Sequence, residues 1–319
     1  MNNTLGVVLV ASGIIYGTPL LIAGLGELLA ERSGVLNLGV EGMMLVGAVV
    51  AFWVSQAMSG PEWIVLVVAL MAAMVAGAAM AGVHGVVSIK FRANQVVSGL
   101  ALTIFGGAIG LSSYFASIAN LGNKPGRHQF GKIDFLGLKN VPVLGPILFH
   151  QDALVYFAWV LVITAVIYLR HTRVGLHLHS VGEDPHAADS MSINVIAYRY
   201  VHTLIGGALA GVAGSYYALS ITPSWTDGMT AGAGWIAIGL VIFAFWRPTL
   251  LLIGAYLFGV VTSLGFTLEA RGVNLPPELF SALPYILTIV ALVVMSSVVA
   301  GRRIGAPAAL GKPYVREEE

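Results

Sequence analysis

Long apolar runs dominate this chain of 319 residues and constrain its fold more than any other feature. A helix needs about 20 mainly apolar residues to cross the hydrocarbon core of a bilayer. Runs of this kind predict spans near 5–28, 35–57, 62–89, 95–118, 152–169, 200–221, 231–246, 248–269 and 282–300. Charged residues make up 10% of the chain, against about 25% in a soluble domain, which leaves too few polar side chains to cover a soluble surface. We therefore predict an all-α, polytopic membrane helix bundle of about nine transmembrane helices.

Basic residues in the connecting segments predict how this bundle is oriented. Lysine and arginine concentrate in the short loops on the cytoplasmic side of a membrane. With the N-terminus outside, eleven of the 16 basic residues fall on the cytoplasmic side and five outside, and the opposite orientation inverts this ratio. We therefore expect the N-terminus outside and the C-terminus in the cytoplasm. The whole chain, 1–319, is then one transmembrane domain with an outer loop at 119–151, a cytoplasmic segment at 170–199 and a cytoplasmic tail at 301–319.

Several classes of chemistry lack support in the sequence. The chain has no cysteine, which excludes disulfides and thiolate metal sites. Its histidines do not combine with a glutamate at the spacing of a zinc-protease helix, and no G-x-S-x-G serine motif is present. Residues 126–132, GRHQFGK, resemble a phosphate-binding loop, but Ile133 stands where a serine or threonine would hold Mg²⁺. We predict a transport subunit rather than an enzyme, with no metal and no cofactor of its own.

Polar residues inside the spans are candidates for a solute pathway, because they are costly in a bilayer. Asn37 and Glu41 are four residues apart and share a helix face with Met44. They fit equally well a polar face that lines a pathway and a hydrogen bond that holds two helices together. Asn94 and Gln95 begin the fourth predicted span and complete the tentative pathway set, although Asn94 also fits a helix N-cap.

Three other polar residues of the spans favour plainer roles. Glu27 and Glu31 lie near the predicted cytoplasmic edge, where solvation or pairing with Arg32 explains them. His84 is expected to be a packing residue rather than a ligand.

A short helix is predicted in the cytoplasmic segment. Asp184 fits its N-cap, and Pro185 fits the first helical position. A helix over 184–195 would carry an apolar stripe. The stripe consists of Ala187, Ala188, Met191 and Ile193 or Val195. By itself this pattern is equally consistent with a helix that rests on the membrane surface.

These residues resemble a known family. The stretch 182–195, GEDPHAADSMSINV, is similar to the cytoplasmic coupling helix of the permease subunits of bacterial ABC importers. Residues 31–44, ERSGVLNLGVEGMM, resemble the signature of the branch that serves nucleosides and simple sugars, which is related to the ribose and branched-chain amino-acid permeases. Residues 94–105 and 234–248 agree with the same branch, so the resemblance extends over most of the chain.

The resemblance implies a set of partners. Two permease subunits, usually different proteins in nucleoside-type systems, form the pore, and this chain resembles the shorter one. A separate or tandem ATPase carries ATP and Mg²⁺ and holds the coupling helices, and a periplasmic or lipid-anchored solute-binding protein delivers the solute. No nucleic acid is involved.

The resemblance also implies which residues couple to the ATPase. They are Gly182, Glu183, Asp184, Pro185, Ala187, Ala188, Asp189, Ser190 and Ile193. The family usually has a glycine before Ile-Asn-Val, and this chain has Ser192. Because serine is small, we expect coupling to be kept.

The resemblance predicts the permease subunit of an ATP-binding-cassette importer, in the plasma (inner) membrane of a bacterium, that forms half of the pathway for a neutral solute. A nucleoside or nucleobase is the favoured solute, and a simple sugar moved by the same machinery is an alternative. An ion-coupled secondary transporter is a second alternative. It would need acidic or acid–base pairs near the midplane, where only Glu41 comes close.

Overall fold

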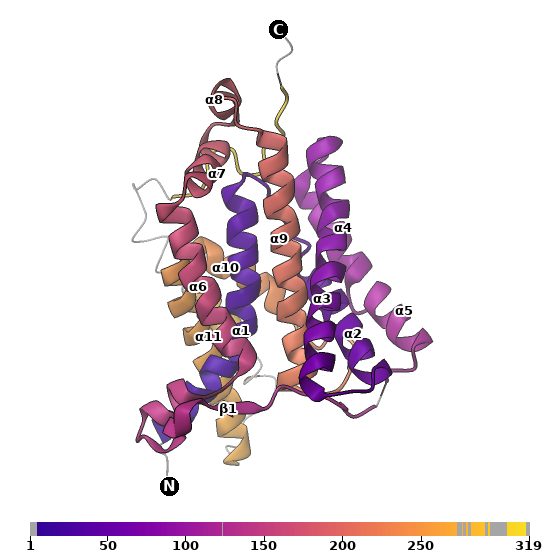
Figure 1. The fold of residues 1–319 in the computed structure, drawn as a ribbon, viewed down its shortest axis with the longest axis vertical. Helices are drawn as coiled ribbons and strands as arrows, with labels where there is room; N and C mark the ends of the chain where they lie inside the picture. Colours follow the sequence, from indigo (N-terminus) through magenta and orange to yellow (C-terminus); the bar gives the residue numbers. More distant parts are fainter. Residues whose placement is uncertain are drawn as a thin grey trace.

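The structure is a computed structural model that describes residues 5–122, 124–272, 276, 279, 282–290, 293 and 305–316. It is an elongated bundle of helices (Figure 1). The helices are α1 (Leu5–Arg32), α2 (Val40–Ala57), α3 (Glu62–Gly85), α4 (Gln95–Gly106), α5 (Leu111–Ile118), α6 (Ala153–His171), α7 (Arg173–Glu183), α8 (Pro185–Ser190), α9 (Val195–Tyr216), α10 (Ala233–Phe243) and α11 (Pro248–Ala270). Short helical turns are η1 (Val86–Lys90), η2 (Phe135–Asn140), η3 (Gly145–Phe149) and η4 (Tyr217–Ile221). Two three-residue strands, β1 (Lys132–Asp134) and β2 (His150–Asp152), pair antiparallel with Lys132 opposite Asp152.

Seven helical segments in the described part of the chain are long and apolar enough to cross a membrane. They are Leu5–Arg32, Val40–Ala57, Glu62–Lys90, Gln95–Ile118, Ala153–His171, Val195–Ile221 and Pro248–Ala270. This confirms the prediction of an all-α membrane bundle, while the count of nine is not confirmed. The predicted span at 231–246 contains α10, whose 11 residues extend only about half of the hydrocarbon thickness. The predicted span at 282–300 is helical over 282–290, and most of its remainder lies outside the described residues.

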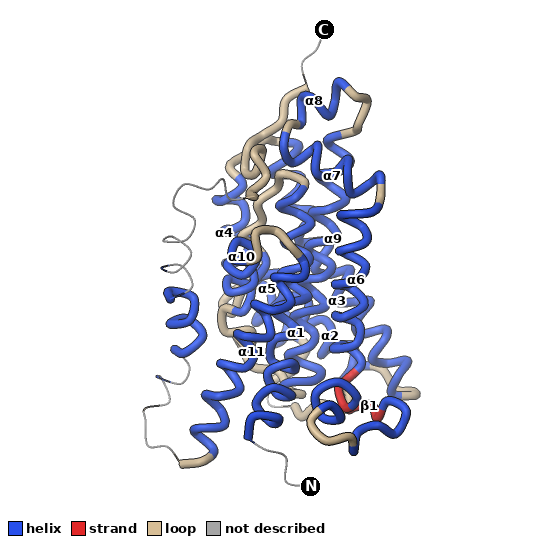
Figure 2. Tube along the Cα trace, turned by 90° about the vertical axis from the view of Figure 1, so that its left-hand side faces the viewer, coloured by secondary structure: helices blue, strands red, loops and turns tan. Residues whose placement is uncertain are grey.

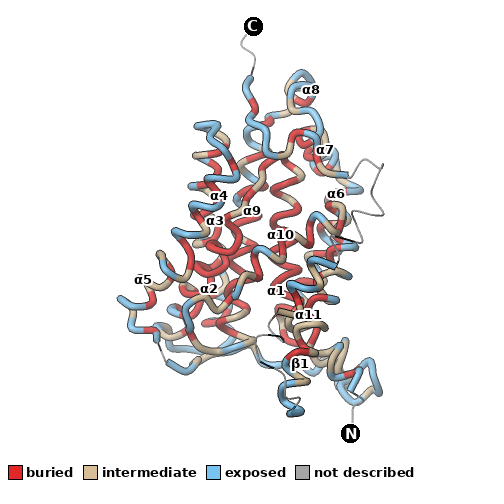
Figure 3. Tube along the Cα trace, turned by 180° about the vertical axis from the view of Figure 1, so that it is seen from behind, coloured by how far each residue is buried: buried red, intermediate tan, exposed pale blue. Residues whose placement is uncertain are grey.

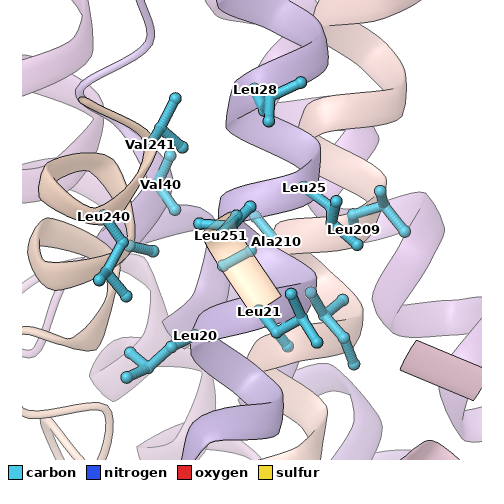
Figure 4. Packing of buried hydrophobic residues seen from close by; sticks show 14 of the residues in the cluster. Leu20, Leu21, Leu25, Leu28, Val40, Leu209, Ala210, Leu240, Val241 and Leu251 are labelled. Carbon is cyan, nitrogen blue, oxygen red and sulfur yellow. The ribbon is translucent and has the colours of Figure 1, made fainter. Parts of the chain in front are cut away.

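Helices α1 and α9 form the centre of the bundle. Helix α1 packs against α9, α10 and α11, and α9 packs against α1, α2 and α3. Figure 3 shows that the buried residues gather along these central helices. Glycine permits close approach of the helices, since a β-carbon at Gly214 of α9 would lie 1.8 Å from the carbonyl oxygen of Met44 in α2. The core between the helices is filled by leucine, valine and alanine side chains from α1, α2, α9, α10 and α11 (Figure 4).

Two segments interrupt the helices inside the bundle. Residues 33–39 connect α1 to α2 without helical structure, and their backbone lies against Glu27 of α1 and Gln95 of α4. Residues 222–232 connect η4 to α10, and the end of this segment reaches Glu41 in the first turn of α2. We name these two stretches the first and the second re-entrant segment. Non-helical backbone at such depth is tolerated in a membrane protein where protein or a cavity surrounds it.

The long connections lie at opposite ends of the molecule. Helices α7 and α8 and the C-terminal stretch 305–316 are at one end, and the β-strands and the beginning of α1 are at the other (Figures 1 and 2). This arrangement is the one expected if 170–199 and 301–319 share one side and 119–151 lies on the other. Which end faces the cytoplasm stays a prediction.

The short helix predicted at 184–195 is shorter in the structure. Helix α8 ends at Ser190 rather than continuing to 195, because Ser192 adopts a left-handed backbone with φ of 62°. Asn194 then caps α9, since its side chain accepts a hydrogen bond from the backbone N–H of Ala197 at 2.9 Å.

Candidate functional site

Glu41 joins the N-termini of two helices in the middle of the bundle. It lies in the first turn of α2, and its Oε1 accepts hydrogen bonds from Thr230 Oγ1 at 2.6 Å and from the N–H of Gly232 at 2.9 Å. Its Oε2 accepts a third from the N–H of Gly234 at 2.6 Å. Free N–H groups and the positive end of the helix dipole make a helix N-terminus a favourable place for a carboxylate. Glu41 therefore accepts hydrogen bonds from free N–H groups at the beginning of α10, while it lies itself in the first turn of α2.

The first re-entrant segment is held by polar side chains from three helices. The N–H of Asn37 donates to Glu27 in α1 at 3.0 Å, and the N–H of Leu36 donates to Gln95 in α4 at 2.7 Å. His84 of α3 lies 3.1 Å from the carbonyl oxygen of Leu36 through Nε2. These bonds replace the helical hydrogen bonds that the backbone of 33–39 lacks, so its polar groups are satisfied away from water. The prediction that His84 is a packing residue agrees with this position, because it is buried between two helices.

The expected roles of Glu27 and Glu31 were wrong. Both side chains are buried, and neither pairs with Arg32 among the described residues. Glu31 accepts a hydrogen bond from the indole N–H of Trp246, while Arg32 Nη2 donates to the carbonyl oxygen of Trp246 at 3.0 Å. Hydropathy placed these glutamates at an edge, but α10 and its connection to α11 cover that part of α1.

A cavity of about 310 Å³ lies beside the Glu41 junction. It is bounded by α1, η4, the second re-entrant segment, α11 and residues 284–285. Its aromatic and polar lining consists of Tyr16, Tyr217, Phe266, Tyr285, Thr222, Thr230, Thr262 and Glu269. Tyr16 and Phe266 pack together with ring centroids 5.2 Å apart, and Tyr285 donates to the carbonyl oxygen of Ala231 at 2.7 Å.

The chemistry of this lining suits a small neutral molecule. Aromatic rings offer flat apolar surfaces, and hydroxyl groups offer both donors and acceptors. Among the described residues that line the cavity, Glu269 is the one charged side chain, and it is exposed. A solute of this size with a planar or apolar face and several hydroxyls would find complementary groups here.

None of the five predicted pathway residues lines the cavity. Glu41 comes closest, because it bonds Thr230, which does line the cavity. Asn37 and Gln95 hold the first re-entrant segment, and Met44 is buried with its carbonyl oxygen against Gly214. The side chain of Asn94 caps α4 by accepting from the N–H of Val97 at 3.1 Å, as the N-cap interpretation expects.

The predicted coupling residues lie together at one end of the molecule. The beginning of α8 is as predicted, since Asp184 Oδ1 accepts from the N–H groups of His186 at 3.1 Å and Ala187 at 3.0 Å, and Pro185 is the first helical residue. Of the predicted apolar stripe, Ala188 is buried against the bundle, whereas Met191 is 77% exposed. The side of α8 that carries Ala188 thus packs inward, while the following Met191 is open to a partner.

The remaining coupling residues surround α8. Gly182 is buried at the end of α7, where a β-carbon would lie 2.2 Å from the carbonyl oxygen of Arg32. Glu183 is exposed and Ile193 is partly buried, while Asp189 forms an ion pair with Arg316. Ser190 donates to the carbonyl oxygen of His186 at 3.0 Å. The geometry brings all nine predicted residues to one end of the molecule, where Gly182 and Ala188 are buried, and their contact with an ATPase stays a prediction.

The electrostatics of this end is set partly by burial. Burial, and then the charge of Arg32, lowers the pKa of His179 on α7 from its usual value. This shift favours the neutral form of the ring beside Arg32.

The sequence predicted a loop at 222–230, but not its contact with Glu41 or the cavity beside it. Thr230 and Tyr217 line the cavity, yet neither belongs to a polar pattern within a predicted span. The available signal was the small-residue run TAGAG at 230–234, which cannot form a regular start for a full-length span. Within the part of the chain that the structure describes, no group of three or more histidine, aspartate or glutamate residues could hold a metal ion.

Comparisons with known proteins identify relatives along nearly the whole chain. A glucose ABC transporter permease of Haloferax volcanii, TsgC13, whose assignment is provisional, is 38% identical over 94% of this chain and 95% of its own length. The nucleoside ABC transporter permease NupC of Lactococcus lactis subsp. cremoris is 35% identical over 99% of both chains. The guanosine ABC transporter permease NupQ of Bacillus subtilis is 34% identical over 97% of both chains. The organisms of NupQ and TsgC13 each contain a more distant second relative, NupP and TsgB13, both 27% identical to this chain. No solved structure gives a significant match.

A family profile matches a part of the chain that includes both Glu41 and α8. The profile described as "Branched-chain amino acid transport system / permease component" matches residues 9–292. Together with the relatives, this decides against an ion-coupled secondary transporter and against an enzyme. The chain belongs to this family of multi-pass permease components of ABC transporters.

Proposed function

We propose that this permease forms half of an import pathway for a nucleoside or nucleobase, and that the cavity beside Glu41 is part of that pathway. The observation that carries the proposal is the lining of the cavity, which combines three tyrosines and a phenylalanine with threonine hydroxyls. A nucleoside pairs a planar base, which stacks on aromatic rings, with a sugar that carries hydroxyl groups. The names of NupC and NupQ support the same solute class.

A simple sugar is the second candidate. TsgC13, a permease provisionally assigned to glucose, shares 38% identity with this chain, and a sugar also uses hydroxyl partners and an aromatic surface. Only a nucleoside has a planar base, so only a nucleoside would stack a base on the aromatic residues of the cavity.

We infer that the working assembly contains a second, different permease, an ATPase and a solute-binding protein, in the plasma membrane. The occurrence of NupP with NupQ in one organism and of TsgB13 with TsgC13 in another supports a pair of unlike permeases. The exposed Met191 and the exposed side of α8 provide the contact for the ATPase. The coupling set is Gly182, Glu183, Asp184, Pro185, Ala187, Ala188, Asp189, Ser190 and Ile193. ATP binding there moves α8 and alternates access to the pathway.

Within this proposal the five predicted pathway residues have different positions. Glu41 supports the cavity wall through Thr230. Asn37, Met44 and Gln95 are buried, so they reach the solute only if the helices around them separate during the cycle, and Asn94 lies at the exposed beginning of α4.

Uptake by the whole importer tests the solute class. The permease is expressed with its partner subunits in cells that lack other nucleoside and glucose uptake, and uptake of labelled guanosine and labelled glucose is measured. We expect guanosine uptake that excess glucose does not inhibit. Glucose uptake that excess guanosine does not inhibit would contradict the nucleoside assignment.

A pair of tyrosine variants tests the cavity. Tyr16→Ala removes a ring that lines the cavity, whereas Tyr114→Ala removes one that is exposed on α5 and does not line it. Loss of base stacking, about 1–3 kcal/mol, should raise KM for guanosine about tenfold in Tyr16→Ala and leave it unchanged in Tyr114→Ala. Equal KM values in both variants would place the solute elsewhere.

A further inference from the structure

The C-terminal stretch 305–316, named here the tail, connects the α8 end of the molecule to the first re-entrant segment. The N–H of Ala309 donates to the carbonyl oxygen of Gly182, at the end of α7, at 2.9 Å. The N–H of Gly311 donates to the carbonyl oxygen of Gly34 at 3.1 Å. Residues far apart in sequence are thus linked through two backbone hydrogen bonds of one short stretch.

A buried arginine fixes the tail over the beginning of α9. Arg199 is 1% exposed, and its Nη1 donates to the carbonyl oxygen of Lys312 at 3.0 Å. Its guanidinium also lies against Gly34, where a β-carbon would be 2.9 Å from Nη2. The tail, α9 and the first re-entrant segment therefore meet at one cation.

The other end of the tail packs on α8. Tyr314 is 8% exposed and forms a small apolar cluster with Val181, Ala188 and Val195. Its ring centroid is 5.3 Å from that of His186. Beyond it, Arg316 Nε lies 3.2 Å from Asp189 in an ion pair that is largely exposed and so contributes little. Tyr314 is therefore the residue that seats the tail on α8.

From Gly34 the contacts continue toward the cavity. Leu36 and Asn37 are bonded to Gln95 and Glu27, and four residues after Asn37 the chain reaches Glu41. Glu41 bonds Thr230, which lines the cavity. A continuous set of packed and hydrogen-bonded groups thus runs from α8 through the tail to the cavity wall.

We propose that the tail is a transmission segment, in which Tyr314 is a positioning residue that makes movement of α8 displace the first re-entrant segment. The inference rests on the proposed function in one respect, which is that the ATPase moves α8. Besides the tail, α8 is connected to the bundle through α7, the turn at 191–194 and a packing contact of Ala188 with Val195 of α9. None of these contacts is a hydrogen bond to the first re-entrant segment itself, whereas the tail bonds Gly34 directly. Movement is carried between distant sites by packed elements of this kind.

The test is the number of ATP molecules hydrolysed per solute molecule imported, measured on the complete importer in proteoliposomes. Tyr314→Ala should lower uptake about tenfold while ATP hydrolysis changes less than about twofold, so that the ratio rises. Tyr314→Phe should restore the ratio, because the ring that packs against Val181, Ala188 and Val195 remains. Val315→Ala is the matched control, since Val315 is adjacent in sequence and exposed.

A second pair of variants keeps the test independent of one side chain. A chain that ends at Gly311 loses Tyr314 and the carbonyl of Lys312, and we expect it to raise the ratio as Tyr314→Ala does. A chain that ends at Arg316 retains every contact described for the tail and should behave as the wild type. Copurification of the ATPase with each variant shows that the assembly is intact.

Two outcomes would overturn the inference. One is an unchanged ratio in both Tyr314→Ala and the chain that ends at Gly311. The other is a fall of uptake and hydrolysis in equal proportion, which a purely structural role predicts. The ratio is measured with whichever solute the wild-type importer carries, so an error in the proposed solute leaves this result interpretable.

Discussion

Both re-entrant segments are non-helical backbone inside the bundle that needs hydrogen-bond partners, and they find these partners in different ways. The first, 33–39, is buried or partly buried throughout, and side chains from α1, α3 and α4 hold its backbone. The second, 222–232, has several exposed residues. It is fixed at its end by the bonds of Thr230 and Gly232 to Glu41, and earlier by bonds from Gly126 to Pro223 and from Ser113 to Asp227. One segment is enclosed by protein, and the other borders a cavity.

The first segment is therefore expected to support the bundle, and the second to contact the solute. A buried segment whose backbone groups are bonded by other parts of the protein has little capacity to bind anything else. A segment with exposed hydroxyls beside a cavity retains donors and acceptors for a ligand. Substitutions in the first segment should therefore act on stability, and substitutions in the second should act on KM.

Glu41 lies in the first turn of α2, directly after the first segment, and bonds the second segment, so its removal should have the largest effect. Glu41→Ala leaves the hydroxyl of Thr230 and the N–H groups of Gly232 and Gly234 without their acceptor inside the bundle. Loss of hydrogen bonds to a buried charged group should cost about 3 kcal/mol or more of stability. Thermal unfolding in detergent should show a lower midpoint, and uptake should be abolished.

The matched control for this variant is Glu62→Ala, which removes an exposed glutamate from the first turn of α3. We expect its unfolding midpoint to stay near that of the wild type. If both glutamate variants unfolded at the wild-type temperature, the two segments would not depend on Glu41 as argued.

The next largest effect is expected in the first segment, at Gly34. Gly34→Ala places a β-carbon on a backbone with φ of +89° and within 2.9 Å of Arg199 Nη2. Strain and displacement of the arginine together should cost about 1–3 kcal/mol. The unfolding midpoint should fall, while KM for the solute should stay unchanged.

Gly137→Ala separates the two causes. Gly137 has φ of +71°, but nothing lies within 4 Å of its β-carbon position. It should therefore show only the backbone cost, about 1 kcal/mol. Equal losses at both glycines would mean that the contact with Arg199 adds nothing.

The difference between the segments also explains what the sequence could predict. Spans such as Leu5–Arg32 and Pro248–Ala270 follow from local hydropathy, and the caps at Asn94 and Asp184 follow from local side-chain chemistry. The motif that contains Asn37 and Glu41 was also found locally, as polar residues within an apolar run, and its part in a solute pathway stays a prediction. Local sequence was sufficient to predict a feature wherever the residues that interact are neighbours in the chain.

Long-range contacts account for what was missed. The partners of Glu41 begin 189 residues further along the chain, and no local pattern connects them. The early end of α8 depended on one left-handed residue, Ser192, which helix periodicity does not reveal. The tail has little hydropathy signal, because its contacts are backbone hydrogen bonds and one tyrosine ring.

A smaller effect, on KM alone, is expected in the second segment. Thr222 and Thr226 are both exposed, but only Thr222 lines the cavity. Thr222→Val keeps the shape and removes the hydroxyl, so the loss of one hydrogen bond to solute, about 1 kcal/mol, should raise KM about fivefold. Thr226→Val should leave KM unchanged, and the unfolding midpoint should be unaffected in both. A KM change of the same size at Thr226 would contradict the assignment of the cavity.

The smallest effect should come from the backbone of the second segment. Ala231 adopts φ of 47° directly before Gly232 at 82°, whereas the first segment places a glycine at its own left-handed position, Gly34. Because glycine adopts this conformation without a β-carbon penalty, Ala231→Gly should stabilise the protein by at most about 1 kcal/mol. The carbonyl that accepts from Tyr285 is retained, so KM should change little while the unfolding midpoint rises slightly. A lower midpoint would mean that the second segment needs the restricted backbone of alanine, and that it is held more firmly than its exposure indicates.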